Sequence, residues 1–413
     1  MQPTDIVILS NGPGEVATWV RPVVKMLTQR ENISLRISVL LSPCPHSTGQ
    51  EAALASSYPG VTRVLPASDF GTFLLWGKTK ANWQWYERGI VVFLGGDQFY
   101  TVAIAKRLGY SSLIYAEWDA RWYRWVDYFA AMNQQAIDRV PPTYRQKFSL
   151  VGDLMADVAL EADLSPPDED APTIGLLVGS KPAKLTQGVP LCLAIAERVK
   201  QQQPQCKFII PVAPTLDLPT LATYASHDHN ALISSLGNVT ARLIQSAAGA
   251  PYLLTAGEVE IELITQFPAY DRIATCNLCL TTVGANTAEL TALRVPMIVL
   301  LPTQQLDAMR SWDGLPGLLA NLPGVGTIFA KLINWLVLRQ KRLFAWPNIW
   351  AQAEIVPELV GKLQPEAVAD LVLDYLNHPS KLQNMKTSLE TVRGKTGAAQ
   401  KIADIIEREI TKT

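Results

Sequence analysis

The sequence lacks an excess of either charge, because 36 Lys and Arg residues nearly balance 37 Asp and Glu residues, for a formal net charge of −1. Such a chain has no overall electrostatic attraction for nucleic acid, so we expect no nucleic-acid partner. No charged leader with an apolar core is found at the start, and no apolar run reaches the roughly 20 residues of a membrane span. We therefore expect a cytoplasmic protein.

The sequence is also poor in residues that bind metals, with five cysteines and four histidines. Cys276 and Cys279 form one C-x-x-C, but a zinc site would need a second pair of ligands, which the sequence lacks. The pair falls in an apolar, strand-like run, which favours burial in the core. The sequence therefore predicts no metal site.

Apolar residues are abundant, at 48% of a chain of 413 residues, which is too long for one compact core. Strand-like runs alternate with helical segments in the first part, and the alternation restarts after a polar, proline-rich stretch at 162–173. This order predicts two consecutive α/β domains with parallel sheets covered by helices on both faces. Such a pair usually holds a ligand at the carboxyl ends of its strands.

The opening stretch, residues 6–24, looks like the start of a dinucleotide-binding domain, with a Gly-x-Gly-x-x-Ala turn beginning at Gly12. However, the next strand-like run ends at residues 42–44 in Ser-Pro-Cys, where a ribose-binding carboxylate would be required. Pro13 also removes a backbone N–H that a phosphate would use. We therefore interpret the turn as the rim of an interdomain cleft, where Glu15 either faces the cleft or only complements a helix dipole.

Two later loops are better suited to bind a nucleotide diphosphate. Residues 176–190 contain a Gly-Ser turn followed by Lys181 and Lys184 before a helix, and ammonium groups with free N–H donors suit phosphate. In the second loop, Gly284 precedes a helix in which the carboxylate of Glu289 could accept hydrogen bonds from ribose hydroxyls. The alternatives are an ordinary Lys-rich loop and an ordinary helix cap with a dipole-favoured Glu.

Six segments of the chain, in the right order, resemble the lipid-A-disaccharide synthases, which are inverting glycosyltransferases of the GT-B type. They are residues 12–19, 93–122, 151–159, 176–185, 283–300 and 346–360. The sequence departs from the family's pattern at Lys181, where the family has Arg, and at Asp153, where it has His. Residues 16–19 replace a Ser-Gly-Asp of the family. The resemblance thus indicates a divergent relative.

The resemblance implies an α/β fold with two Rossmann-like parallel-sheet domains facing across a cleft. Residues 1–160 would form the acceptor-side domain, 161–173 a linker, and 174–413 the nucleotide-sugar-binding domain with its C-terminal helices. A UDP-sugar would be the donor substrate, with no separate cofactor and no metal. The acceptor would be a lipid or a lipid-linked molecule, which implies a peripheral position on the inner face of a membrane. The oligomeric state is not predicted.

The resemblance also implies roles for individual residues. Asp97 is the candidate base that takes the proton of the acceptor hydroxyl, with helix capping as the alternative, and Glu15 is a second catalytic candidate. The expected donor-binding residues are Gly179, Ser180, Lys181, Gly284, Ala285, Asn286, Thr287, Glu289 and Asn348.

An apolar segment at 312–345, broken by Gly and Pro, ends in basic residues and suits insertion into an anionic membrane surface. The alternative is a buried interdomain helix or an oligomer interface. Residues 118–125 form a second cluster of Trp and Arg, which either flanks the acceptor or belongs to the core. The candidate acceptor or membrane residues are Trp118, Arg121, Trp122, Trp335, Arg339 and Arg342.

Two other functions compete with glycosyl transfer. A sugar-nucleotide epimerase or hydrolase on the same scaffold would turn over a nucleotide sugar without a lipid acceptor and would not need the apolar segment. A non-catalytic relative would keep the fold and bind a membrane or a partner, and the replacement of the family's Arg by Lys181 favours this alternative.

Overall fold

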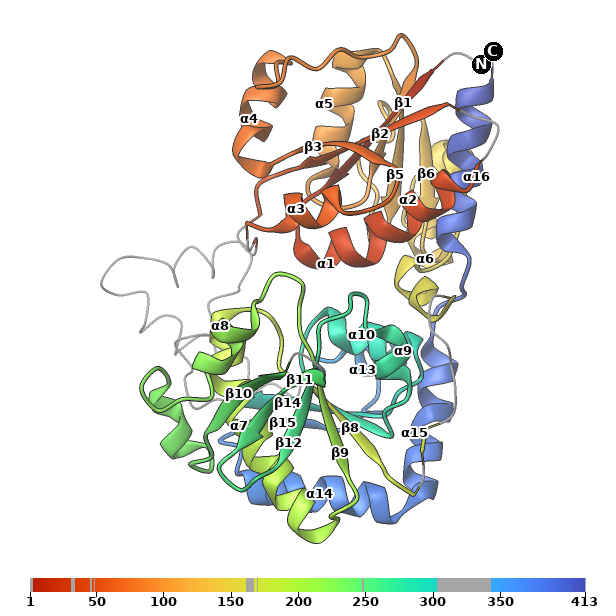
Figure 1. Ribbon diagram of the computed structural model, residues 1–413. Helices are drawn as coiled ribbons and strands as arrows, with labels where there is room; N and C mark the ends of the chain where they lie inside the picture. The colour runs from red at the N-terminus through yellow and green to blue at the C-terminus, as the bar shows by residue number, and fades with distance from the viewer. Residues whose placement is uncertain are drawn as a thin grey trace, which may run out of the picture. The chain divides into compact units, whose positions relative to one another are not determined.

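The computed structural model describes residues 3–30, 34–44, 47, 49–160, 167–168, 170–246, 249–302 and 343–412. The chain divides into two compact units, each built on one sheet (Figure 1). Unit 1 consists of Met1–Leu160 and Gly394–Thr413, and unit 2 consists of Glu161–Arg393. Residues 161–166 and 169 of the expected linker lie outside the described residues.

Unit 1 is built on a seven-stranded sheet with the order β3-β2-β1-β4-β5-β6-β7, in which all neighbouring strands are parallel. The interior strand β1 is buried along its whole length, as is usual where helices cover both faces of a parallel sheet. The strands are β1 (Thr4–Ser10), β2 (Leu35–Leu41), β3 (Val61–Leu65), β4 (Gly89–Phe93), β5 (Ser111–Ala116), β6 (Tyr128–Ala131) and β7 (Phe148–Leu150).

Helices cover both faces of this sheet because successive strand residues point to opposite sides. Ile6 and Ile8 pack in one cluster with α2 and α16, whereas Val7 and Leu9 pack in another with α4 and α5. The helical elements of unit 1 are α1 (Pro13–Glu15), the π-helical turn η1 (Val16–Val20), α2 (Arg21–Thr28), α3 (Glu51–Ser56), α4 (Ala67–Trp76), α5 (Gln98–Leu108), α6 (Gln134–Asp138), the 3₁₀ turns η2 (Pro142–Lys147) and η3 (Leu154–Leu160), and α16 (Ala398–Thr411).

Unit 2 is built on an eight-stranded sheet with the order β10-β11-β12-β9-β8-β13-β14-β15. The six strands from β12 to β15 in this order are parallel, and β10 and β11 extend the sheet by antiparallel pairing that the sequence analysis does not predict. The strands are β8 (Thr173–Leu177), β9 (Lys207–Pro211), β10 (Ala241–Ser246), β11 (Gly249–Thr255), β12 (Glu260–Ile264), β13 (Leu278–Thr282), β14 (Met297–Pro302) and β15 (Glu358–Gly361).

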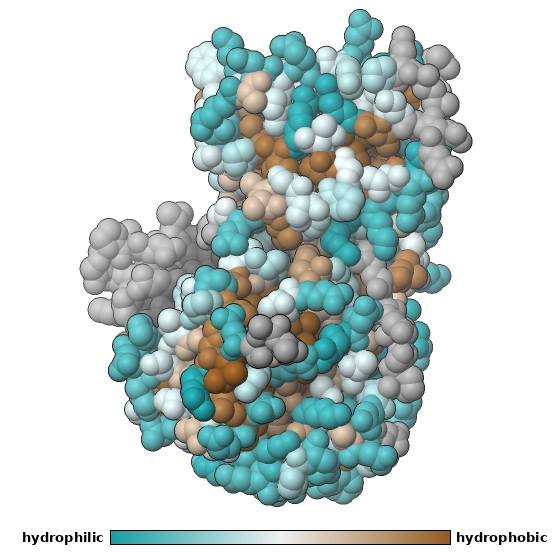
Figure 2. Space-filling model, viewed as in Figure 1, coloured by the Kyte–Doolittle hydropathy of each residue, from teal (hydrophilic) through white to brown (hydrophobic). Residues whose placement is uncertain are grey.

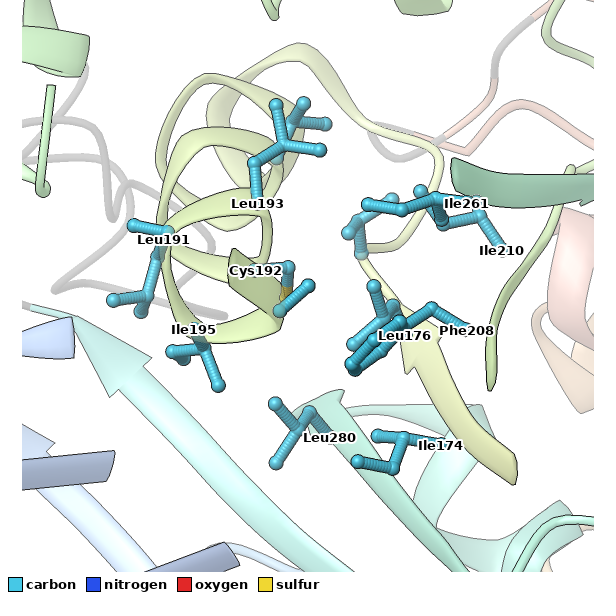
Figure 3. Packing of buried hydrophobic residues seen from close by; sticks show 14 of the residues in the cluster. Ile174, Leu176, Leu191, Cys192, Leu193, Ile195, Phe208, Ile210, Ile261 and Leu280 are labelled. Atoms are coloured by element: carbon cyan, nitrogen blue, oxygen red, sulfur yellow. The ribbon is translucent and has the colours of Figure 1, made fainter. Parts of the chain in front are cut away.

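Two layers of helices cover the second sheet. Helices α7 and α14 pack together on one face, and α10, α13 and α15 contact one another on the other (Figure 1). Figure 3 shows strand residues such as Leu176 and Phe208 facing Cys192 and Ile195 of α7. The helical elements of unit 2 are α7 (Pro182–Gln202), α8 (Leu218–Thr223), the 3₁₀ turn η4 (Ala231–Ser235), α9 (Tyr270–Ala274), α10 (Ala285–Ala292), α13 (Trp346–Ala351), α14 (Pro365–Asn377) and α15 (Pro379–Val392).

The expected α/β fold with two Rossmann-like parallel-sheet units is therefore confirmed. The assignment of the last residues to the second domain is wrong, because α16 belongs to unit 1. Its apolar residues, among them Ile402 and Ile406, are buried in the unit 1 core. Asp157 on η3 is also buried, and its carboxylate accepts hydrogen bonds from the N–H groups of Gly397, Ala398 and Ala399 at the start of α16. A carboxylate at this end of a helix both caps it and complements its dipole.

We expect Asp157→Ala to destabilise unit 1 by about 1–3 kcal/mol, because the substitution leaves buried N–H groups at the start of α16 without an acceptor. Urea denaturation measures this loss as a change in the free energy of unfolding. The matched control is Asp404→Ala on the same helix, which removes an exposed partner of Arg30 and should cost less than about 1 kcal/mol. Equal losses in the two variants would contradict the capping role of Asp157.

Candidate functional site

The loops that follow β8 and β13 meet at the carboxyl edge of the second sheet, since these two strands are parallel neighbours. The helix after β8 is α7 and the helix after β13 is α10, and they cover opposite faces of the sheet (Figure 1). The two loops therefore diverge at a topological switch point, the place where open α/β sheets usually bind ligands.

Each of these loops has a glycine with a positive φ, +86° at Gly179 and +140° at Gly284. A Cβ atom on Gly179 would lie 3.0 Å from Cδ of Lys184, and a Cβ atom on Gly284 would lie 3.2 Å from Nζ of the same lysine. Glycine thus supplies the backbone conformation of both turns and leaves the space that the Lys184 side chain occupies.

Lys184 connects the two loops. It lies in the first turn of α7, and its Nζ donates a hydrogen bond of 2.6 Å to the carbonyl oxygen of Val283 in the loop after β13. Burial and the positive charge of Lys181 lower the pKa of Lys184 to about 8. No carboxylate among the described residues forms an ion pair with Lys184. Sequence analysis places this lysine near phosphate but does not predict that it joins both loops.

The other expected donor residues of these two loops are partly exposed. Ser180 and Lys181 directly precede α7, and Ala285 and Asn286 open α10. The first N–H groups of a helix have no partner within it, so these helix starts offer donors to an anion.

The side chains of two expected donor-binding residues, Thr287 and Asn348, face inward, so neither side chain is open to a ligand, and the expected contribution of the Thr287 N–H group stays a prediction. Both are 0% exposed. The Thr287 hydroxyl donates to the carbonyl of Gly284 (2.9 Å) and accepts from the N–H of Trp346 (3.2 Å). The Asn348 amide donates to a carboxylate oxygen of Glu358 (2.7 Å) and to one carbonyl, and its oxygen accepts two backbone N–H groups. These side chains hold α13 to its neighbours, because buried polar groups must be hydrogen-bonded.

Glu289 is on α10, one residue from the core-facing Leu290, and its side chain hydrogen-bonds Tyr270 of α9. Burial raises the pKa of Glu289 to about 7. Its expected contact with a ribose stays a prediction.

Because the pKa of Glu289 is higher in the folded protein than the ordinary value near 4.5, the folded state binds more protons between these two pH values. The contribution of Glu289 to stability therefore falls as pH rises from about 4.5 through 7. We expect Glu289→Gln to be more stable than the unsubstituted protein at pH 8, by about 1–3 kcal/mol, and to differ little at pH 4.5. Urea denaturation at pH 4.5 and pH 8 measures the difference in free energy of unfolding, with the exposed Glu260→Gln as the control. A difference that does not change with pH would contradict the prediction.

Unit 1 has a corresponding switch point between β1 and β4, but a carboxylate covers its glycine turns. A Cβ atom on Gly95 would lie 3.2 Å from both Cβ and Cγ of Glu15, and a Cβ atom on Gly12 would overlap the Glu15 carboxylate. A negative charge over these turns repels phosphate. This geometry supports the interpretation that the opening turn is not a pyrophosphate site.

Asp97 follows Gly96 after β4 and is exposed. One oxygen of its carboxylate accepts a hydrogen bond of 2.9 Å from the N–H of Phe99, so it caps α5. This is the capping alternative that the sequence leaves open, and the role of Asp97 as a base stays a prediction. In the part of the chain that the structure describes, no three His, Cys, Asp or Glu side chains are grouped to hold a metal ion.

Sequence reasoning missed Glu117, which directly follows β5 at the same edge of the first sheet. Burial, with the nearby charges of Asp153 and Glu15, raises the pKa of Glu117 to about 7, although a hydrogen bond from Trp118 opposes the shift. Burial also raises the pKa of Asp153 to about 6. The sequence contains a signal for this residue, because Glu117 directly follows a strand-like run at the carboxyl edge of the sheet.

The aromatic residues near Asp97 form a partly exposed cluster of Phe99, Trp122 and Trp125. The Trp122 ring lies 5.2 Å from that of Phe99 and 5.5 Å from that of Trp125, which is 57% exposed. Arg121 is exposed and pairs with Asp119 (3.3 Å). Figure 2 shows a mainly hydrophilic surface with hydrophobic patches on both units.

The predicted membrane residues Trp335, Arg339 and Arg342 lie outside the described residues, as does most of the apolar segment 312–345. In the regions that the structure describes, no helix combines the length and apolar character needed to span a bilayer.

No protein-family model matches the chain. Among curated proteins, the chain is 22% identical over 227 residues to the lipid-A-disaccharide synthase of Nitrosococcus oceani, over 55% of this chain and 45% of that protein. It is 25% identical over 236 residues to the lipid-A-disaccharide synthase of Anaeromyxobacter sp. (strain K), over 56% of this chain and 48% of that protein. The chain is a divergent relative of the lipid-A-disaccharide synthases. The matched region spans about half the length of these relatives.

Solved structures share the fold over nearly the whole chain. The S. aureus MnaA co-structure with UDP has a TM-score of 0.56 at 12% identity, covering 99% of this chain and 98% of that one. The UDP-GlcNAc 2-epimerase from Neisseria meningitidis, bound to UDP-GlcNAc, has a TM-score of 0.53 at 11% identity, covering 98% and 100%. The fold is thus of the two-unit GT-B type, consistent with the relation to lipid-A-disaccharide synthases.

Proposed function

We propose that this relative of the lipid-A-disaccharide synthases is an inverting glycosyltransferase that moves a sugar from a UDP-sugar to a lipid-linked acceptor at a membrane surface. The observation that most strongly supports this proposal is the switch point of unit 2, where two glycine turns and two helix starts surround a lysine with no carboxylate partner among the described residues. This arrangement suits a diphosphate group.

The donor half of the reaction belongs to unit 2. The N–H groups at the starts of α7 and α10, together with the charge of Lys181, would stabilise the diphosphate as it leaves the sugar. Glu289 would accept hydrogen bonds from the ribose hydroxyls. This division follows from the opposite charges over the glycine turns, positive at Lys184 in unit 2 and negative at Glu15 in unit 1.

The acceptor half belongs to unit 1, whose carboxylates can take a proton. Asp97 would accept the proton of the acceptor hydroxyl as its oxygen bonds to the anomeric carbon. The bond from this carbon to the diphosphate breaks at the same time, and its electron pair leaves with UDP. Glu15 and Glu117 lie at the same edge of the sheet, and the exposed rings of Phe99 and Trp125 would contact the acceptor.

A sugar-nucleotide epimerase is the second candidate, favoured by one observation. The structural likeness to the UDP-GlcNAc 2-epimerase covers nearly the whole chain, whereas the sequence match to the lipid-A-disaccharide synthases covers little more than half of it. An epimerase would convert a UDP-sugar without any acceptor, so the products distinguish the two.

The test of transfer incubates the full chain with a panel of UDP-sugars, with and without a detergent-solubilised lipid acceptor, and measures released UDP and glycosylated lipid. We expect UDP release that depends on the acceptor, and a fall of about 10²–10⁴-fold in Asp97→Asn with unchanged UDP affinity. The control Asp119→Asn removes a nearby exposed carboxylate and should retain activity.

Other outcomes would contradict glycosyl transfer in distinct ways. An epimeric UDP-sugar formed without acceptor would support the epimerase. UDP binding without turnover of any sugar in the panel would support a non-catalytic relative. Full activity in Asp97→Asn would remove this residue from the mechanism and point to Glu15 or Glu117.

Membrane association is proposed for the basic end of the apolar segment. Each Lys or Arg near an anionic bilayer contributes about 1 kcal/mol to binding, so the double variant Arg339→Ser and Arg342→Ser should bind phosphatidylglycerol vesicles about 10–30-fold more weakly. Vesicle sedimentation measures this, with phosphatidylcholine vesicles as a control that should show no difference. Equal binding of both proteins to anionic vesicles would exclude this role.

A further inference from the structure

We propose that Lys184 is the counter-ion of the nucleotide diphosphate in unit 2, and that the protein takes up a proton at this lysine when the diphosphate binds. The inference deepens the proposed function and rests on it, because it assigns the principal cation of the donor site. It also separates two lysines of one loop, since Lys181 occupies the place of the related family's Arg.

The position of Lys184 between the two loops supports this assignment. The Lys184 side chain occupies the space beside both Gly179 and Gly284, and its Nζ is 2.6 Å from the carbonyl oxygen of Val283. The ammonium thus lies at the meeting point of the two loops and next to two helix starts. An anion bound by the N–H groups of both helices would lie within reach of this charge.

Lys184 has no carboxylate partner among the described residues. Lys184 is partly buried, and Val283 is its one hydrogen-bond acceptor among the described residues, although an ammonium has three donors. Burying a charge without a counter-ion is costly. The Thr282 hydroxyl is also buried without a hydrogen-bond partner in the described regions. It lies near Lys184, because a Cβ atom built on Gly179 would be 3.6 Å from this hydroxyl and 3.0 Å from Cδ of Lys184. A bound anion would satisfy both groups.

Among the described charged groups, Lys181 is the one that shifts the pKa of Lys184, and it favours the neutral amine. On its own loop, Lys181 is the charged neighbour, and it repels a second positive charge. The loop after β13 contributes the carbonyl of Val283 but no charged side chain. On α10, Glu289 hydrogen-bonds Tyr270. No described carboxylate therefore stabilises the ammonium, and a diphosphate would be the first negative charge to do so.

The protonation state follows from these contacts. The pKa of Lys184 is about 8, so close to half of the molecules have a neutral amine at pH 8. An anion raises the pKa of a nearby lysine. Binding at pH 8 should therefore take up about 0.5 proton per site, and binding at pH 7 about 0.1. Affinity should fall up to tenfold per unit above pH 8, until the pKa of the complex is reached.

The experiment is isothermal titration calorimetry of the full chain with UDP at pH 8, in buffers such as Tris and HEPES whose ionisation enthalpies differ. The slope of apparent enthalpy against ionisation enthalpy gives the number of protons taken up. We expect about 0.5 for the unsubstituted protein and none for Lys184→Met, with an affinity at least tenfold lower in the variant. A circular dichroism melting curve checks that the variant is folded.

Lys184→Arg is the matched control, because a guanidinium stays charged at all these pH values. This variant should retain most of the affinity for UDP while losing the proton uptake, a pattern that a merely structural role of Lys184 would not produce. Lys181→Met should weaken binding but retain uptake. Pyrophosphate should give the same uptake as UDP, and uridine none, which assigns the effect to the phosphates.

The possible failures are distinguishable. UDP binding with equal affinity and equal proton uptake in Lys184→Met would overturn this inference and leave the proposed function intact. Proton-linked UDP binding without sugar transfer would support the inference and contradict the transferase. An absence of UDP binding by every form of the protein would overturn the inference together with the donor site.

Discussion

The structure of the candidate site depends on one constraint: at each switch point a charged side chain occupies space that a Cβ atom on the neighbouring glycines would enter. In unit 2 the lysine over Gly179 and Gly284 meets this condition, and in unit 1 the glutamate over Gly12 and Gly95 does. The two sheets have the same parallel switch point, so the backbone alone does not distinguish a phosphate site from any other. The two switch points differ in the sign of the charge that lies over their glycine turns.

This difference explains why the opening turn resembles a dinucleotide site without having its chemistry. Its glycines satisfy the geometry of a tight strand-to-helix turn, but the space above them belongs to Glu15. Burial and the charges of Asp153 and Glu15 raise the pKa of Glu117 at this edge, which favours acid–base chemistry over anion binding. In unit 2, the polar side chains of Thr287 and Asn348 do not face the carboxyl edge of the sheet. They form buried hydrogen bonds that position α13.

The sequence was informative where local patterns decide the structure. The alternation of strand-like and helical runs predicts the two parallel-sheet units, because apolar runs and helix caps are local features. The sequence predicts that Lys184 precedes a helix, whereas α7 begins at Pro182 and includes Lys184. The direction of a side chain does not follow from local sequence patterns. The motif that includes Asn348 resembles the related family, but packing determines that its amide faces inward. The pairing of Lys184 with Val283 joins residues 99 positions apart.

The return of α16 to the first sheet has a consequence for how the chain is made. Unit 2 is an insertion within the sequence of unit 1, so residues 3–160 leave the ribosome before the helix that covers part of their core has been translated. Before α16 is made, the apolar surface that Ile402 and Ile406 cover is open to solvent. The Asp157 carboxylate then also lacks the hydrogen bonds that it accepts from the first N–H groups of α16. Unit 2 consists of one contiguous stretch of the sequence, whereas the core of unit 1 is completed only by α16, which follows unit 2 in the sequence.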